Sequence, residues 1–381
     1  MAQSRRQGFL DASSGEPLLP EARQAWLAAQ DAGWGDPLRL HRAGRRAAQA
    51  LDQARALVAS AVGARPDDVV FPGSGPHAAH AAIAGLARGR RRVGRAIVTS
   101  AVDHSSVLAA ASAYGDAVTV PVDQVGRLDL QAWRLAVQEE GVALACLQVG
   151  NHEVGTLQPY WEAADACVAA EVPMVLDASS ALGRMDLTDA GDWSVLVGSA
   201  AAFGGPPSVG ILAIRKGARW RAPYPVDDYQ FGRWPGLPDV PAIFSAAVAL
   251  ETWMTDFEQV GARQHQLVGL LRDGLADAVS DIDIVGDPDR RLPHLLTFSA
   301  LYVDGETLTL ELDRAGFAVA SGSACSASSE HPSHVLAAMG ALTHGNVRIG
   351  LTRSSTAADI EAFLLAAPQV VEQLRARLGA P

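Results

Sequence analysis

The stretch from Ala143 to Leu176 reads ALACLQVGNHEVGTLQPYWEAADACVAAEVPMVL and contains one complete strand–helix–strand repeat. The apolar run Ala143–Gln148 predicts a buried strand, and the Ala-rich segment Tyr160–Ala170 predicts a helix. A second apolar run, Met174–Leu176, predicts the next strand. Strands that alternate with helices in this way are typical of an α/β protein with a mainly parallel sheet.

The same alternation continues on both sides of this repeat. A helix is predicted at residues 43–62, and further strands are predicted at residues 67–71, 96–99, 195–197 and 209–214. A Pro- and Trp-rich stretch at 220–241 and a helix at 242–255 end the first unit, and strands at 295–298, 317–320 and 347–351 begin a second one. We therefore expect a large α/β domain over residues 13–255 and a small α+β domain built from residues 1–12 and 256–381.

Composition excludes several classes of protein. The 381 residues are 49% apolar and 19% charged, which is ordinary for a globular chain. The net charge of −11 argues against a nucleic-acid surface, and we interpret the basic cluster 88–95 as a solvated loop before a strand. No apolar stretch has transmembrane length and no signal peptide is recognisable, so we expect no membrane contact. Three cysteines form no disulfide framework, which favours a cytoplasmic location, and we predict no metal site.

The segment Ser321–Ser329 reads SGSACSASS and places Cys325 among small residues. A structural cysteine usually lies in an apolar run, as Cys146 does. A thiol in a loop without bulky neighbours suits a thiolate that moves between two partners. The alternative is a Ser/Gly linker with an incidental cysteine.

Polar residues follow several of the predicted strands. His104 follows the strand at 96–99, and Asp177 follows the strand at 174–176. The carboxyl ends of parallel strands are where α/β sheets bind ligands, but Asp and Ser residues after a strand also cap helices. Arg353 ends the motif Val347–Arg353, where an arginine can clamp a carboxylate or simply face solvent.

Taken together and in order, these segments resemble the cysteine desulfurases of the class V aminotransferase family. The resemblance covers nearly the whole chain, and its most specific parts are residues 151–159, 199–210, 321–336 and 347–353. It implies a fold-type I aminotransferase-like structure, with a mainly parallel seven-stranded sheet in the large domain. It also implies a homodimer, because the family builds its site across two subunits.

The resemblance implies a role for each matching residue. Members of the family take sulfur from cysteine with pyridoxal phosphate (PLP) and carry it as a persulfide. Cys325 matches the sulfur-accepting cysteine and Arg353 matches the clamp for the substrate carboxylate. His104 matches the histidine that stacks on the cofactor, Asp177 the partner of the pyridine nitrogen, and Ser199 a phosphate contact.

The chain departs from the family around the same cofactor. The family's Ser-x-His-Lys turn is Ser199-Ala200-Ala201-Ala202 here, so Ala202 stands where the family has its Schiff-base lysine. Alanine supplies no amine for that bond. Lys216 is the only lysine in the chain, and we expect it to face solvent beyond the next strand.

Three further positions depart from the family pattern. Pro76 replaces a phosphate-gripping threonine, His152 replaces an asparagine that contacts the ring oxygen, and Ser180 replaces a glutamine. If Asp177 is buried, it needs a new hydrogen-bond donor, and His152 is a candidate. We therefore interpret His104, His152, Asp177, Ser180, Ser199 and Ala202 as a vestigial cofactor site.

These observations predict a cysteine desulfurase-like protein that has lost PLP chemistry and handles sulfur on Cys325. We expect no cofactor, or PLP held without a covalent bond. An alternative is a non-catalytic partner that stabilises or regulates another protein, for example a desulfurase paralogue. A third reading keeps an active desulfurase with non-covalent PLP. Whether the chain is an enzyme stays open at this stage, as do its sulfur donor and acceptor.

Overall fold

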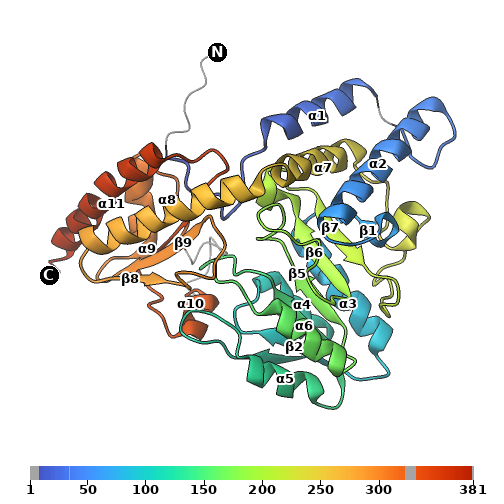
Figure 1. Cartoon of the computed structure of the whole chain (residues 1–381), viewed down its shortest axis with the longest axis horizontal. Helices are drawn as coiled ribbons and strands as arrows, with labels where there is room; N and C mark the ends of the chain where they lie inside the picture. The colour runs from blue at the N-terminus through green and yellow to red at the C-terminus, as the bar shows by residue number, and fades with distance from the viewer. Residues whose placement is uncertain (1–7, 34, 322–331, 380–381) are drawn as a thin grey trace.

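The structure is a computed structural model that describes residues 8–33, 35–321 and 332–379 (Figure 1). Cys325 lies outside the described residues. The larger unit is built on a seven-stranded sheet with the strand order β1-β7-β6-β5-β4-β2-β3. Its strands are β1 (Val69–Val70), β2 (Ala96–Ser100), β3 (Asp116–Val120), β4 (Val142–Gln148), β5 (Met174–Asp177), β6 (Val195–Ser199) and β7 (Gly210–Ile214).

The sheet is mainly parallel, as the sequence predicts. Strands β3, β2, β4, β5 and β6 pair in parallel, whereas β7 pairs antiparallel with both β6 and β1. The helices of this unit are α1 (Pro20–Asp31), α2 (Arg42–Ala61), α3 (Gly75–Arg90), α4 (Ser105–Tyr114), α5 (Leu130–Gln138), α6 (Tyr160–Ala169) and α7 (Val240–Met254). The α/β prediction is therefore confirmed.

Helices cover both faces of the sheet, which explains why its central strands are continuous apolar runs. Successive side chains of a strand point to opposite faces. Along β5, Met174 and Leu176 belong to one core, whereas Val175 belongs to the other. The second core contains the apolar faces of α3 and α4. Every residue of β4 is buried, since the strand lies between these two layers.

In the described part of the chain, the smaller unit combines four helices with an antiparallel sheet of the order β10-β9-β8. Its elements are α8 (Phe257–Ala278), β8 (Ile282–Val285), β9 (Leu295–Ala300), α9 (Gly305–Arg314), α10 (His334–Met339), β10 (Asn346–Gly350) and α11 (Ala357–Leu378). The N-terminal segment joins this unit, because Phe9 and Asp11 form parallel bridges with Ala318 and Gly350. The exact domain boundaries stay a prediction.

Several strand predictions differ from the structure: β8 is absent from the prediction, and residues 67–68 of the predicted strand 67–71 belong to a 3₁₀ turn, Pro66–Asp68. Residues 317–320 form only isolated bridges, from Ala318 to Phe9 and from Ala320 to Arg348, instead of a regular strand. Strand β3 is absent from the prediction because only Val120, its last residue, is buried. Among the described residues, no helix is both long enough and apolar enough to cross a membrane.

The first residue of β7, Gly210, packs tightly against the start of α3. The backbone nitrogen of Gly210 donates to Pro72 O at 2.7 Å. A methyl group on Gly210 would overlap the carbonyl oxygen of Ser74, the N-cap of α3. By contrast, a methyl group on Gly269, within α8, meets no atom within 4 Å.

We expect Gly210→Ala to lower the free energy of unfolding by about 1–3 kcal/mol, because the overlap must be relieved by a backbone shift. The matched variant Gly269→Ala is expected to raise it by about 0.5–1 kcal/mol, because alanine favours a helix interior over glycine. Urea unfolding of both variants checks the prediction. Equal stability of Gly210→Ala and the parent chain would contradict the close packing of β7 on α3.

Candidate active site

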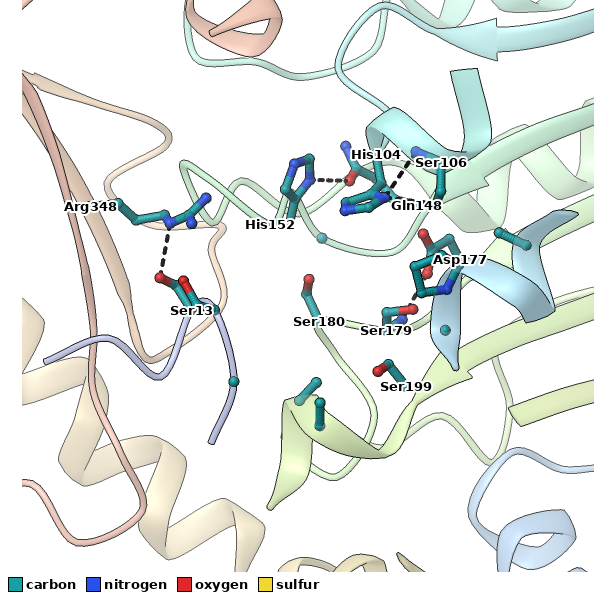
Figure 2. Close-up of a pocket in the computed structure, with 18 residues that line it drawn as sticks. Ser13, His104, Ser106, Gln148, His152, Asp177, Ser179, Ser180, Ser199 and Arg348 are labelled. Carbon is teal, nitrogen blue, oxygen red and sulfur yellow. Dashed lines mark hydrogen bonds between the residues drawn. The ribbon is translucent and has the colours of Figure 1, made fainter. Parts of the chain in front are cut away.

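A cavity of about 340 Å³ lies at the carboxyl ends of β2, β4, β5 and β6 (Figure 2). Ligands bind at this edge in open α/β sheets. Its wall includes all six residues of the vestigial cofactor site, namely His104, His152, Asp177, Ser180, Ser199 and Ala202. The structure therefore brings together residues that are almost 100 positions apart in the sequence. It adds Ser13, Gln148 and Arg348, which the sequence reasoning did not assign to the site.

Asp103 joins the ends of β2 and β4 beneath the cavity. One carboxylate oxygen accepts from Ser100 N at 2.8 Å, and the other accepts from Gln148 N at 3.0 Å. Complete burial raises the pKa of Asp103 to about 8, although both N–H donors act to lower it. Asp103 is thus a structural tie between two strands and lies behind the cavity wall.

His104 is the N-cap of α4 and also lines the cavity, so both sequence-based readings of this position apply. Its Nδ1 accepts from Ser106 N at 3.1 Å and lies 2.7 Å from Ser106 Oγ. Burial lowers the pKa of His104, and nearby Asp177 only partly offsets this effect. The histidine is therefore a neutral ring at the cavity wall near pH 7.

His152 packs edge-on against His104, with ring centroids 4.8 Å apart. Its Nδ1 lies 3.4 Å from Gln148 Oε1, and its buried Nε2 has no hydrogen-bond partner among the described residues. Burial lowers the pKa of His152 well below its usual value, and His104, Arg348 and His334 lower it further. The ring is therefore neutral, and its Nε2 lies 3.7 Å from Glu153 Oε1.

Asp177 and Ser180 come from the turn that follows β5. Asp177 Oδ1 accepts from Ser179 N at 2.9 Å. The donor that the sequence analysis sought for this carboxylate is thus a backbone N–H, while His152 pairs with Gln148 instead. The turn closes locally because Asp side chains readily accept from the N–H two residues on. Ser180 lines the same part of the cavity.

The start of α3 forms another part of the wall. A methyl group on Gly75 would lie 2.7 Å from Ser199 Cβ, so glycine allows the helix to approach the end of β6. Ser74 caps the helix by accepting from His77 N at 3.2 Å. Pro76 lines the cavity but has no N–H to offer an anion.

Ala202 lies in a short 3₁₀ turn, Ala200–Phe203, directly after β6. Its side chain contributes a methyl group to the cavity wall. Its carbonyl oxygen accepts from Arg184 Nη2 at 3.0 Å, and the same nitrogen pairs with Glu16 at 3.0 Å. Both charged side chains are almost completely buried. The buried ion pair between Arg184 and Glu16 therefore holds the turn in place.

Lys216 lies at the opposite edge of the sheet. It lies two residues after Ile214, the last residue of β7, and Ile214 pairs with Val195 at the amino end of β6. Ala202 instead follows Ser199, which lies at the carboxyl end of β6. The strand between them has five residues and spans roughly 16 Å at about 3.3 Å per residue. Lys216 is exposed, which confirms the sequence prediction, and no lysine lines the cavity.

Arg353 does not line the cavity. Its Nη2 lies 2.7 Å from Asp256 Oδ1, and its guanidinium carbon lies 5.1 Å from the ring centroid of Trp253. The sequence analysis predicted a cavity clamp at this position. Instead, Arg348 on β10 lines the cavity, and its Nε donates to Ser13 Oγ at 2.9 Å.

The alternation of core and non-core side chains along β10 could have identified Arg348. Its neighbours Val347 and Ile349 belong to the core of the smaller unit. Because side chains alternate along a strand, Arg348 must point away from that core and toward the larger unit.

The two described cysteines are poor nucleophiles. Cys146 and Cys167 are both buried and free. Burial raises the pKa of Cys146 well above its usual value and raises that of Cys167 to about 12. Neither residue therefore supplies a thiolate near neutral pH.

The neutral state of His152 predicts a pH-dependent stability. Its pKa is depressed in the folded protein, so only the unfolded state takes up this proton as the pH falls below about 6.5. Folding then loses about 1.4 kcal/mol per pH unit from this residue. We expect His152→Gln to remove that loss between pH 6.5 and about 5.5, as measured by urea unfolding at each pH.

The exposed residue His344 provides the control. His344→Gln is expected to keep the parent's pH dependence in this range. If His152→Gln shows the same slope as the parent, the buried ring is protonated in the folded state and the assignment is wrong.

Comparisons with known proteins agree with this arrangement. The model of the class V aminotransferase family matches residues 33–363. A cysteine desulfurase of Cereibacter sphaeroides is 36% identical, and the match covers 97% of this chain and 96% of that protein. An IscS-like cysteine desulfurase of Mycobacterium tuberculosis is 32% identical over 96% of this chain and 97% of that protein.

Solved structures show the same fold. A NifS-like protein superposes with a TM-score of 0.89 at 24% identity, covering 96% of this chain and all of that one. DndA from Streptomyces lividans has a TM-score of 0.76 at 26% identity, covering 90% of this chain and 99% of its own. The chain therefore belongs to the class V aminotransferase family, and it is a cysteine desulfurase-like member of it.

Proposed function

We propose that this protein has given up covalent PLP chemistry and handles sulfur as a persulfide on Cys325. The observation that carries the proposal is the turn after β6, which presents Ala201 and Ala202 to the cavity. A covalent bond to a pyridoxal aldehyde requires a primary amine. The only lysine side chain is a strand length away on the opposite edge of the sheet.

The residues present do not fit a covalently anchored cofactor. Pro76 offers no N–H at the start of α3, which weakens this end as a phosphate site. His104, Asp177 and Ser199 still line the cavity, so a planar ring could be held there without a covalent bond. These residues support non-covalent binding at most, and no step of the proposed reaction uses the cofactor.

Cys325 is the remaining thiol of the chain. Cys146 and Cys167 are buried with raised pKa values, which leaves Cys325 as the cysteine suited to sulfur transfer. Its thiolate would attack the outer sulfur of a persulfide donor. A bond forms between these two sulfur atoms, the donor's sulfur–sulfur bond breaks, and the donor leaves as a thiolate with the bonding electron pair.

Two further expectations belong to this proposal. The resemblance to cysteine desulfurases supports a homodimer. A reducing cytoplasmic setting, which would keep Cys325 available as a thiol, also stays a prediction.

Borohydride trapping tests for a covalent cofactor. After incubation with one molar equivalent of PLP and reduction, we expect no stoichiometric labelling of the parent chain, because no amine lines the cavity and the exposed amine of Lys216 reacts only in proportion to the PLP concentration. Ala202→Lys restores an amine to the wall and is expected to gain one bound cofactor. Intact-protein mass spectrometry provides the measurement.

Lys216→Arg is the matched control, because it contains no lysine at all. Stoichiometric labelling of the parent chain that is lost in Lys216→Arg would contradict the proposal, because it would show a bound cofactor on Lys216 rather than the concentration-dependent reaction of an exposed amine.

Sulfur transfer is tested with a small-molecule persulfide as the donor. We expect one added sulfur atom on Cys325, located by peptide mass spectrometry, and no added sulfur in Cys325→Ser. Cys167→Ser is expected to behave like the parent, because the Cys167 thiol is buried. If Cys325→Ser accepts sulfur normally, or if no cysteine accepts it, the non-catalytic partner role becomes the better explanation.

A further inference from the structure

A second cavity, the arginine cavity, lies where α3 ends and has a volume of about 300 Å³. Three arginines of the basic cluster 88–95 line it, namely Arg88, Arg91 and Arg95, together with Tyr114 at the end of α4. No acidic side chain of the described chain belongs to its wall. Residues 69–102 likewise contain no aspartate or glutamate, although the whole chain has a net charge of −11. The cavity is therefore a local concentration of positive charge on an acidic protein.

Two arginines of the cluster have a structural role at the end of α3. Arg88 Nη1 donates to Ala222 O at 2.8 Å, and Arg90 Nη2 donates to Glu171 O at 3.1 Å. Both arginines lie in the last turn of the helix, where cations interact favourably with the carbonyl end of the helix dipole. Arg90 does not line the arginine cavity, whereas Arg88 does.

Arg91 and Arg95 have no comparable structural role. Both follow α3, which ends at Arg90, and both are exposed. The Arg91 side chain forms no hydrogen bond or ion pair within the part of the chain that the structure describes. Arg95 Nη2 lies 3.5 Å from Asp116 Oδ1, but each of these side chains is 70% exposed, and ion pairs this exposed contribute little. Two cations of the cavity are therefore available to an anion.

The rest of the wall is held in place without a ligand. Trp220 Nε1 donates to Ala81 O at 3.0 Å, which keeps the segment leading to Pro223 against α3. Pro223 is part of the wall. The ring of Tyr114 packs edge-on against His80, with ring centroids 6.1 Å apart. A tyrosine hydroxyl can donate to an anion, so Tyr114 adds a hydrogen-bond donor at a fixed position.

The composition of the wall favours a diphosphate group as the ligand. Three guanidinium groups offer more N–H donors than the two oxygens of a carboxylate can accept. A diphosphate has enough oxygens to pair with several arginines at once, and its several negative charges balance theirs. A nucleic acid fits less well, because it would extend beyond the cavity toward Asp116 and the rest of an acidic surface.

We propose that Arg88, Arg91 and Arg95 bind the diphosphate group of a small molecule at the end of α3. This site is distinct from the cavity at the carboxyl ends of the strands, which Gly75 at the start of α3 lines. The 16 residues of α3 separate the two sites by roughly 24 Å at about 1.5 Å per residue. The inference depends on neither PLP nor Cys325, so its failure would leave the proposed function untouched.

Isothermal titration calorimetry on the full chain tests the site, with inorganic pyrophosphate as the probe. A salt concentration of about 0.15 M screens the attraction of distant charges. We expect the parent chain to bind pyrophosphate, and to bind sulfate about tenfold more weakly or worse, because sulfate carries fewer charges and oxygens. Sulfate binding as tight as pyrophosphate binding, or no binding of pyrophosphate, would overturn the proposal.

ADP distinguishes two sources of the diphosphate group. An affinity for ADP equal to or above that for pyrophosphate assigns the site to a nucleoside diphosphate. A weaker affinity for ADP assigns it to free pyrophosphate.

Two neighbouring arginines locate the binding site. We expect Arg91→Gln to weaken pyrophosphate binding by about tenfold, because charge-assisted hydrogen bonds are lost. Arg92→Gln is the matched control, since Arg92 is also exposed and carries the same charge but does not line the cavity. It should bind like the parent. Equal losses in both variants would indicate general attraction to a basic loop, and no loss in Arg91→Gln would place the anion elsewhere. Either result would overturn the proposal.

Asp116→Asn provides a test with the opposite sign. Asp116 competes with an anion for Arg95, so its neutral variant is expected to bind pyrophosphate about twofold more tightly or better. An affinity at or below that of the parent chain would remove Arg95 from the site and contradict the proposal.

Discussion

The site depends on one buried carboxyl group, that of Asp103. It accepts from Ser100 N at the end of β2 and from Gln148 N at the end of β4, so it fixes two adjacent strand ends relative to each other. The backbone oxygen of the same residue lies 2.9 Å from His334 Nε2, which connects α10 of the smaller unit to this edge. Loss of either donor would leave a buried carboxyl oxygen without a partner, which costs more than the bond contributed and makes this tie hard to replace.

The strand ends that Asp103 aligns determine which side chains line the cavity. His104 follows β2, His152 follows β4 and Asp177 ends β5, so parallel strands place three polar groups at one edge. The smaller unit completes the wall with Arg348 from β10. The larger unit therefore contributes neutral rings and a carboxylate, and the smaller unit contributes the cation. The cavity is therefore lined by both units rather than by either one alone.

Sequence patterns predicted the parts of this arrangement that depend on interactions between residues close together in the sequence. Alternating strands and helices gave the mainly parallel sheet, and strand ends located His104, Asp177 and Ala202 at the cavity. Strand β3 was missed because it is exposed except at Val120, and an exposed strand lacks an apolar run. The position of Arg353 depends on Asp256 and Trp253, which lie about a hundred residues earlier in the chain. No local pattern around Arg353 shows that contact.

A buried network supports the turn that carries Ala202. Arg184 donates to the carbonyl oxygen of Ala202 and pairs with Glu16, whose second oxygen accepts from the backbone of Arg353. The guanidinium of Arg184 also lies 4.6 Å from the ring centroid of Trp253. One buried network thus supports the turn, fixes the segment around Glu16 and holds Arg353 outside the cavity. Because these contacts join residues far apart in the sequence, the position of the turn depends on the tertiary fold rather than on its local sequence.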